Sequence, residues 1–415
     1  MQNMSSTSQH DVKGEIKKYV WVDALRGYAI LLVIMAHSGQ AIFGIAPPLG
    51  IINNGIHGVS LFFLASSFTL FNSYKNRSAL DGKNKNLFFF IRRLFRIAPL
   101  YWIACLTYVI AAYLYQSVWI PPAPLSFVKV MANVLFLNGV YIPAIIYLPP
   151  GSWSIGDEMM FYVAIPFLFA MIRNLQAATF LIVAAIVGSI AVQLLAYYVI
   201  TGYTSYSWEL QREWALFLWL PNQFPIFCFG IALYFFLGTN KIKYKEWMLA
   251  IPVVGYLLLA SFMPWDLSFP YFLIQNEYIY AALFFVFAFC MSKTKLRFPL
   301  MPINKLGMVS FSVYLIHFLV IDLGTWLSEL AFGGQLNKEL NFFLLFAFTV
   351  FTTYFIAKWT YEYIEKYGMA LGERLIERIK NRASFKTSKF NSDNVVIQQN
   401  PGIQYSEDRS KIAGK

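Results

Sequence analysis

The chain has 415 residues, of which 58% are hydrophobic, 19% aromatic and only 13% charged. A water-soluble protein carries about twice that share of charged residues, so the composition excludes a soluble globular protein and indicates a polytopic membrane protein. The formal net charge of +12 is not gathered in a solvated basic domain, which argues against nucleic-acid binding.

Ten apolar runs are long enough to cross about 30 Å of hydrocarbon as helices. If the amino terminus is cytoplasmic, all of the 33 Lys and Arg residues except Lys129, Arg212 and Lys338 fall on the cytoplasmic side. The positive-inside rule describes this bias. We therefore predict an all-α polytopic membrane protein with about ten transmembrane helices and both termini cytoplasmic. The predicted spans are 27–46, 56–73, 96–116, 158–173, 177–200, 214–237, 247–263, 271–291, 307–330 and 341–362.

The two ends of the chain are polar. Residues 1–18 and 381–415 are predicted to be disordered, because neither segment can bury a core. Residues 368–380 mix Ile and Leu with Arg, Lys and Glu at helical spacing, which predicts an amphipathic helix at the inner leaflet. The membrane domain, residues 19–367, is then expected to carry the function.

The first apolar stretch carries two ionisable residues, Arg26 and His37. Eleven residues of α-helix turn through about 1100°, so the two side chains lie within roughly 20° of one face and about 16 Å apart along the axis. A histidine that deep in hydrocarbon costs at least a few kcal/mol and is a functional-site hypothesis. Imidazole accepts and returns protons near neutral pH, so His37 is predicted to be a catalytic base. The alternative is a core histidine bonded to a neighbouring carbonyl.

His57 precedes the second span and is interpreted first as a solvated histidine at the outer mouth, with a polar role there as the alternative. The segment between the second and third spans, residues 74–96, is basic. At its end Arg93 and Arg96 stand three residues apart, which would place them on one face of a helix. Two guanidinium groups placed in this way could hold phosphates by bidentate hydrogen bonds. The alternative is a loop that is basic because of topology alone.

Segment 117–157 is the longest predicted extracytoplasmic stretch, with prolines at 121, 122, 124, 143, 149 and 150. Proline density argues against a straight crossing. We expect an interfacial or re-entrant element over the outer mouth of the bundle, where irregular backbone is tolerated only beside protein or water.

The run from Trp153 to Glu158 leads into the fourth span. Ser154, Glu158 and Tyr162 recur every four residues, so one helix face would carry a hydroxyl, a carboxylate and a phenol. Such a face could orient a substrate hydroxyl or tune His37 from the opposite helix. Ser154 could also be the helix N-cap, with Asp157 as the cap partner.

The ninth span contains Ser310-Phe311-Ser312-Val313-Tyr314-Leu315-Ile316-His317. Tyr314 and His317 are three residues apart and Asp322 is five further on, which indicates a polar stripe facing the bundle. We assign His317 first to a hydrogen-bonded tie between helices, with substrate or proton handling as the alternative.

Four of these strings resemble the acyltransferase 3 family of integral-membrane O-acyltransferases, over roughly residues 20–367. They are the Arg-x10-His spacing that follows Asp23, the Arg-x-x-Arg of Arg93 and Arg96, the Trp-Ser-x-x-x-Glu-x-x-Phe-Tyr string beginning at Trp153, and the string ending at His317. The chain departs from the family pattern at Ser60, where an acid is usual, at Ser67 in place of glycine, and at Tyr367 in place of proline.

The resemblance implies transfer of an acyl group, usually acetyl from acetyl-CoA, to a sugar hydroxyl on a glycan or glycolipid. His37 would remove the hydroxyl proton or carry the acyl group itself. The residues implied in the site are His37 and Glu158 in catalysis, Arg26, Arg93 and Arg96 in donor binding, and Asp23, Trp153, Ser154, Tyr162 and His317 in acceptor binding or support.

Acyl-CoA is expected as the donor substrate, with no bound cofactor. No metal is expected, because no two histidines stand three to five residues apart. The other expected partners are a polysaccharide or glycolipid acceptor, the lipid bilayer and glycan-assembly proteins, in a bacterial inner membrane. The rival hypothesis is a multi-helix transporter or flippase of a lipid-linked sugar, which would also place His and Glu inside a helical bundle.

Overall fold

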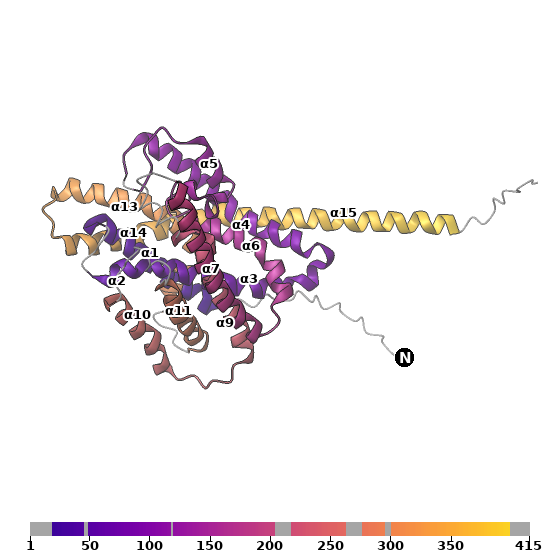
Figure 1. Cartoon of the computed structure of the whole chain (residues 1–415). Helices are drawn as coiled ribbons and strands as arrows, with labels where there is room; N and C mark the ends of the chain where they lie inside the picture. Colours follow the sequence, from indigo (N-terminus) through magenta and orange to yellow (C-terminus); the bar gives the residue numbers. More distant parts are fainter. Residues whose placement is uncertain are drawn as a thin grey trace, which may run out of the picture.

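The computed structural model describes residues 19–44, 49–117, 119–203, 217–262, 276–294 and 300–398. These residues form helices joined by turns and bends, with no β-strand among them, which confirms the predicted all-α class. Figure 1 shows a helical bundle from which the last helix projects. The predicted disordered arm, residues 1–18, lies outside the described residues, as do residues 399–415 of the predicted disordered tail.

The longer helices alternate with short helical turns along the chain. The longer ones are α1 (Val20–Phe43), α3 (Gly58–Asp81), α4 (Lys85–Leu114), α6 (Trp153–Met171), α7 (Leu175–Tyr203), α9 (Leu220–Thr239), α10 (Ala250–Phe262), α11 (Asn276–Lys293), α13 (Ser310–Phe332), α14 (Lys338–Thr360) and α15 (Lys366–Gln398). The shorter ones are α2 (Gly50–Asn53), η1 (Asn54–His57), η2 (Gly82–Asn84), α5 (Phe127–Val134), η3 (Leu137–Gly139), η4 (Ile142–Ala144), η5 (Glu246–Leu249), α12 (Leu300–Met308) and the π-helical turn η7 (Tyr361–Glu365).

Within the described ranges, seven segments are long and apolar enough to cross a membrane. One of them, Gly50–Leu114, contains both α3 and α4, and another, Lys338–Arg382, joins α14 to the first half of α15. Each of the ten predicted spans overlaps a helix. The number of crossings and the orientation of the termini stay predictions.

Several helices begin earlier than their apolar runs predicted, α1 and α6 among them. α1 starts at Val20 rather than at residue 27, and α6 starts at Trp153 rather than at residue 158. Backbone hydrogen bonding adds residues to an existing helix at little cost, so a helix can continue past the apolar run when its first turn is packed. Val22 and Leu25 are buried in α1, as Trp153 and Ile155 are in α6. Polar residues of both motifs therefore lie on helices instead of in loops.

Helix α1 runs through the centre of the bundle and packs on α3, α11, α12, α13 and α14. Its contact with α12 is a close backbone approach that depends on glycine. A Cβ built on Gly307 would lie 1.7 Å from the Asp23 carbonyl oxygen, and one on Gly27 would lie 2.2 Å from the Ile303 carbonyl oxygen. Small residues permit such an approach between membrane helices.

The proline-rich segment after α4 folds into short elements, α5, η3 and η4, that lie against α4 and α6 at the top of Figure 1. Ser152, just before α6, donates a hydrogen bond of 2.9 Å to Asn133 Oδ1 and accepts one of 3.1 Å from Asn138 Nδ2. These buried contacts fix the segment to the start of α6. Its position relative to a membrane stays a prediction.

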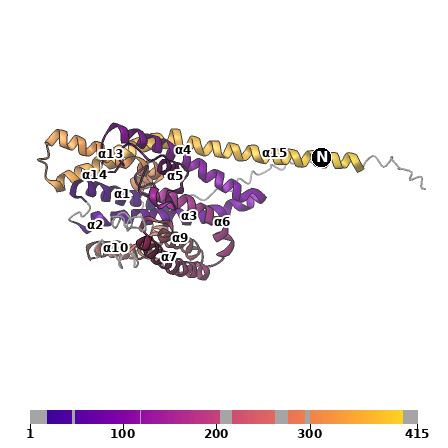
Figure 2. The ribbon, with the colours of Figure 1, turned by 45° about the horizontal axis from the view of Figure 1, so that its top comes forward.

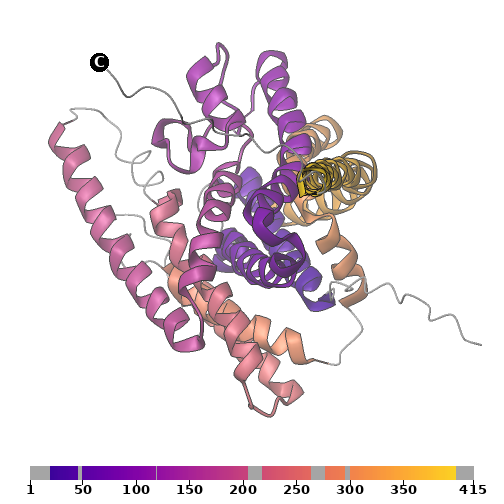
Figure 3. The same cartoon turned by 90° about the vertical axis from the view of Figure 1, so that its right-hand side faces the viewer.

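Helix α15 continues through Gln398, so the expected disorder from residue 381 was wrong for residues 381–398. That stretch contains neither Gly nor Pro, and extending an existing helix is cheap compared with nucleating one. Ion pairs hold the first part of α15 against α3 and α4, with Asp81 reaching both Arg92 at 2.6 Å and Lys380 at 3.1 Å. Figure 2 shows the helix projecting from the bundle, and Figure 3 looks along it. The predicted amphipathic helix, 368–380, lies within α15.

Candidate active site

A pair of histidines joins α1 to α13 in the middle of the bundle. His37 Nδ1 lies 3.1 Å from His317 Nε2, and His317 Nδ1 lies 2.7 Å from the carbonyl oxygen of Tyr314. A carbonyl oxygen can only accept, so Nδ1 of His317 carries the hydrogen. In the neutral pair, Nε2 of His317 is then the acceptor and His37 Nδ1 is the donor. The lone pair of His37 is thereby assigned to Nε2.

The ring of His37 is enclosed by aromatic side chains. Its centroid lies 4.5 Å from Phe318 and 5.5 Å from Trp119, which meets it edge-on. His317 is fully buried, whereas His37 is half-buried. The sequence did not single out Trp119, which lies in the proline-rich segment. It reaches His37 only because that segment folds back over the bundle.

A cavity of about 790 Å³ counting its open mouth, here called the inner cavity, lies toward the amino end of α1. Its charged lining comes from four elements: Arg26 of α1, Arg93 and Arg96 of α4, Glu158 of α6, and Glu365 of η7. Arg93 and Arg96 thus face one space, as their three-residue spacing predicted. The neighbouring Arg92 instead pairs with Asp81 and with Glu373 of α15.

The arginines of the inner cavity are held by specific contacts. Arg26 Nη2 donates to Thr69 Oγ1 at 3.2 Å, and Asp23 lies 3.7 Å from Arg26 Nη1. The guanidinium of Arg93 lies 5.9 Å from the centre of the Tyr162 ring, and its Nε is buried without a hydrogen-bond partner. A buried N–H without a hydrogen-bond partner raises the free energy of the folded protein, and an anionic ligand that accepts from it would remove this cost.

Glu158, Ser154 and Tyr162 line the inner cavity together, which agrees with the predicted polar face of this helix. Tyr162 donates to Glu158 Oε1 at 2.7 Å, and Ser66 of α3 donates to the same oxygen. These two hydrogen bonds fix one carboxylate oxygen of Glu158 in the cavity wall. Of the two roles predicted for Glu158, the direct contact with His37 is not made, since its hydrogen bonds go to Tyr162 and Ser66. Orienting a substrate hydroxyl stays a prediction.

The capping role predicted for Ser154 and Asp157 was also wrong. The helix begins at Trp153 with Ser152 as its N-cap residue, and no side-chain cap bond is made. The Ser154 hydroxyl oxygen instead lies 2.8 Å from the Tyr314 hydroxyl oxygen. Asp157 is fully buried, and its carboxylate oxygens have no hydrogen-bond partner.

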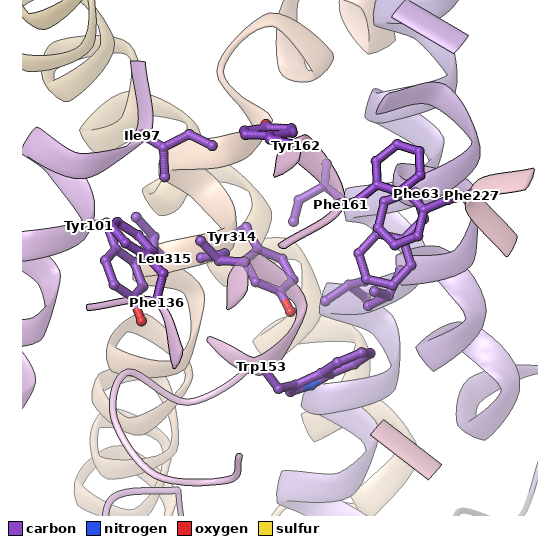
Figure 4. Close-up of a cluster of buried hydrophobic side chains, with 14 of the residues drawn as sticks. Phe63, Ile97, Tyr101, Phe136, Trp153, Phe161, Tyr162, Phe227, Tyr314 and Leu315 are labelled. Carbon is purple, nitrogen blue, oxygen red and sulfur yellow. The ribbon is translucent and has the colours of Figure 1, made fainter. Parts of the chain in front are cut away.

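Tyr314 connects the inner cavity to the histidine pair. Its side chain lines the cavity, and its ring centroid lies 5.6 Å from that of His317. Figure 4 shows Tyr314 between Tyr162 and Trp153 in this view. Trp153, predicted in the site, packs edge-on against Phe63 with their ring centroids 6.0 Å apart. It therefore supports the cavity wall.

A second cavity, of about 1700 Å³ counting its open mouth, lies beyond the histidines and is here called the outer cavity. Trp119 lines it, together with Ala41 of α1 and Asp322 of α13. The order along α1 is Arg26, His37, Ala41, and along α13 it is Tyr314, His317, Asp322. The histidine pair therefore lies between the two cavities.

His57 is not solvated, which corrects its first interpretation. It is 1% exposed, its Nδ1 lies 2.9 Å from Glu277 Oε1 of α11, and its ring stacks on Tyr280 at 3.8 Å. Ser60 donates to the other oxygen of Glu277 at 2.5 Å. Glu277 thus brings a carboxylate to the residue that stands where the resemblance leads us to expect an acid.

Sequence reasoning gave no role to Glu277 or Glu365, although an acid inside or beside an apolar span was a usable signal. Glu365 accepts a hydrogen bond from Ser312 of α13 and lines the inner cavity. In the described part of the chain, no group of three His, Cys, Asp or Glu side chains is placed to hold a metal ion.

Residues 19–362 match the family model described as an acyltransferase domain, that of the acyltransferase 3 family. The chain belongs to this family. The match spans most of the chain and includes the histidine pair and the whole of α4 and α6. Comparison with curated proteins and with solved structures found no match. The protein is accordingly a multi-pass membrane acyltransferase.

Proposed function

We propose that this acyltransferase moves an acyl group, acetyl in the first instance, from cytosolic acyl-CoA to a sugar hydroxyl of a cell-surface polysaccharide or glycolipid. The observation that carries the proposal is the position of the His37–His317 pair between a cavity with three arginines and a second, open cavity. Transfer between two compartments needs a base that both substrates can approach. Family membership supplies the acyl chemistry.

The donor is assigned to the inner cavity because of its charges. Arg26, Arg93 and Arg96 line it, and coenzyme A carries a pyrophosphate and a ribose phosphate. Guanidinium groups bind phosphates by paired, charge-assisted hydrogen bonds, typically stronger than neutral ones. The thioester at the end of the long pantetheine arm would then pass Tyr314 toward His37.

The chemical step uses the tautomer assigned above. His37 Nε2 takes the proton from the sugar hydroxyl as its oxygen attacks the thioester carbonyl carbon. The carbon–sulfur bond then breaks, and the imidazolium returns the proton to the coenzyme A sulfur. The products are an O-acyl sugar and free coenzyme A. His317 is a positioning residue here, because it keeps the hydrogen of His37 on Nδ1.

The same base permits a covalent route. His37 Nε2 attacks the thioester carbon, the carbon–sulfur bond breaks and coenzyme A leaves as its thiolate. The sugar oxygen then attacks the acyl-imidazole carbon, the bond to Nε2 breaks, and the hydroxyl proton passes to the coenzyme A thiolate. We place the protein in the bacterial inner membrane with both termini cytoplasmic, as the basic loops predict. Glycan-assembly proteins would supply the acceptor.

The test measures ester-linked acetate on surface glycans by mass spectrometry, before and after alkali has hydrolysed the esters. Cells would express the intact protein, His37→Ala, or His10→Ala at equal membrane abundance. His10 is a matched control because it is a histidine well outside the family match. We expect acetate with the intact chain and His10→Ala and its loss with His37→Ala.

Unchanged acetate with His37→Ala would exclude this histidine as base or carrier. A transporter or flippase of a lipid-linked sugar is the second candidate, because two cavities separated by an ionisable pair would also suit alternating access. It predicts that the lipid-linked sugar accumulates on the cytoplasmic side when the protein is absent, whereas the acyltransferase predicts no such accumulation.

A further inference from the structure

The outer cavity is a built space with a mixed lining. Tyr115 and Trp119 follow α4, and Asp322, Trp326 and Glu329 lie along the last turns of α13. The lining combines aromatic rings with hydroxyl and carboxylate groups. Binding sites for small molecules have this character, with apolar walls and a few placed polar groups.

The aromatic rings suit a pyranose. One face of a pyranose ring presents C–H groups, which pack against flat aromatic surfaces, while its hydroxyls need donors and acceptors around the edge. Trp326 is 60% exposed and half-buried Trp119 lies deeper, beside His37. A sugar in this cavity would therefore have one ring near the mouth and another near the catalytic histidine.

The charge of the lining is negative. Asp322 and Glu329 both line the outer cavity, and among the described residues that line it there is no Lys or Arg. The Tyr115 hydroxyl donates to Asp322 Oδ2 at 3.2 Å, which orients that carboxylate. Carboxylates accept hydrogen bonds from hydroxyl and ammonium groups and repel other carboxylates.

We propose that the outer cavity binds the acceptor glycan and that its acidic lining selects neutral or amino sugars over uronate-type acidic sugars. This inference rests on the proposed function for its biological meaning, but sugar binding itself does not require acyl transfer. It assigns Trp326 and Asp322 as specificity-determining residues.

The test is equilibrium dialysis of the purified full-length protein in detergent with three fluorescently labelled trisaccharides, built from glucose, glucosamine and galacturonate. No acyl-CoA is present. We expect the glucose and glucosamine probes to bind at least tenfold more tightly than the galacturonate probe. Trp326→Ala should weaken both by about tenfold, the loss of one aromatic contact. Asp322→Asn should narrow the preference for glucosamine over galacturonate.

Trp359→Ala is the matched control, because Trp359 on α14 is 59% exposed and does not line the cavity. An exposed tryptophan also suits the membrane interface, where an aromatic belt is common. In that case Trp326→Ala would behave like Trp359→Ala, and the inference would be refuted. Failure of all three probes to bind at millimolar concentration, or galacturonate binding as tightly as glucose, would also overturn it.

The two proposals fail separately. Normal acetate transfer in cells with Trp326→Ala or Asp322→Asn, together with unchanged probe binding, removes the outer-cavity assignment and leaves the acyltransferase proposal intact. Selective probe binding in a protein that transfers no acetate leaves the sugar site and removes the transferase proposal.

Discussion

Replacing His317 by Phe keeps a buried ring of similar size but removes the nitrogen that accepts from His37 Nδ1 at 3.1 Å. The Val33 backbone carbonyl remains as an acceptor for His37, so losing the bond to His317 costs about 0.5–1.5 kcal/mol. His37 can avoid that cost by moving its hydrogen to Nε2, the nitrogen that must act as base. Because about 1.4 kcal/mol is a factor of ten in rate, kcat should fall roughly 2- to 12-fold.

The KM for acyl-CoA should stay within about twofold of the intact chain, because His317 does not line the inner cavity. His317→Asn provides the rescue test, since its amide oxygen can accept the same hydrogen bond, and it should recover part of the lost kcat. The assay is the initial rate of transfer from radiolabelled acetyl-CoA in membranes of equal protein abundance.

A wild-type kcat in His317→Phe would refute the tautomer assignment. An equal loss of kcat in the Phe and Asn variants would also refute it. Asn can accept the hydrogen bond from His37 and Phe cannot, so equal losses would mean that this hydrogen bond does not matter for catalysis. A rise in KM with kcat unchanged would move His317 from positioning the base to binding the donor.

Two further outcomes test the rest of the site. Arg93→Ala and Arg96→Ala should each raise the KM for acyl-CoA by about tenfold or more, because each variant loses a charge-assisted hydrogen bond to phosphate. Arg92→Ala is the control, since Arg92 pairs with Asp81 and Glu373, and it should leave KM unchanged. Equal KM values in all three variants would exclude the phosphate assignment. Glu277→Leu should lower the unfolding temperature of the purified protein by several degrees, because it leaves the buried partners of Glu277 without a hydrogen bond at about 1–3 kcal/mol each. Glu277→Gln should lower that temperature less. Equal unfolding temperatures in the Leu variant and the intact chain would show that the buried cluster contributes no stability.

The spacing of residues within one helix was enough to predict part of the site. Arg93 and Arg96 face one cavity, and Ser154, Glu158 and Tyr162 share one face, because the helical repeat fixes both arrangements locally. The predicted cap at Ser154 failed for a related reason. A cap depends on where the helix begins, and packing against neighbouring segments moved that point to Trp153.

Contacts between distant parts of the chain could not be predicted in this way. His37 meets a partner 280 residues away, and Glu277 reaches Ser60 across 217 residues. Neither pair has a local spacing rule. The signal available was weaker, namely that an ionisable residue in an apolar span needs a partner of some kind.

The sequence by itself determined the all-helical membrane class, the family, and the face on which each motif residue lies, because hydrophobicity and the 3.6-residue repeat act along one segment at a time. Tertiary structure alone decided that His317, rather than Glu158, is the partner of His37, and that the pair separates two cavities. Which helices become neighbours depends on the summed packing of the whole bundle, including close approaches such as Gly307 against α1. That sum is spread over many weak contacts, and no single motif contains it.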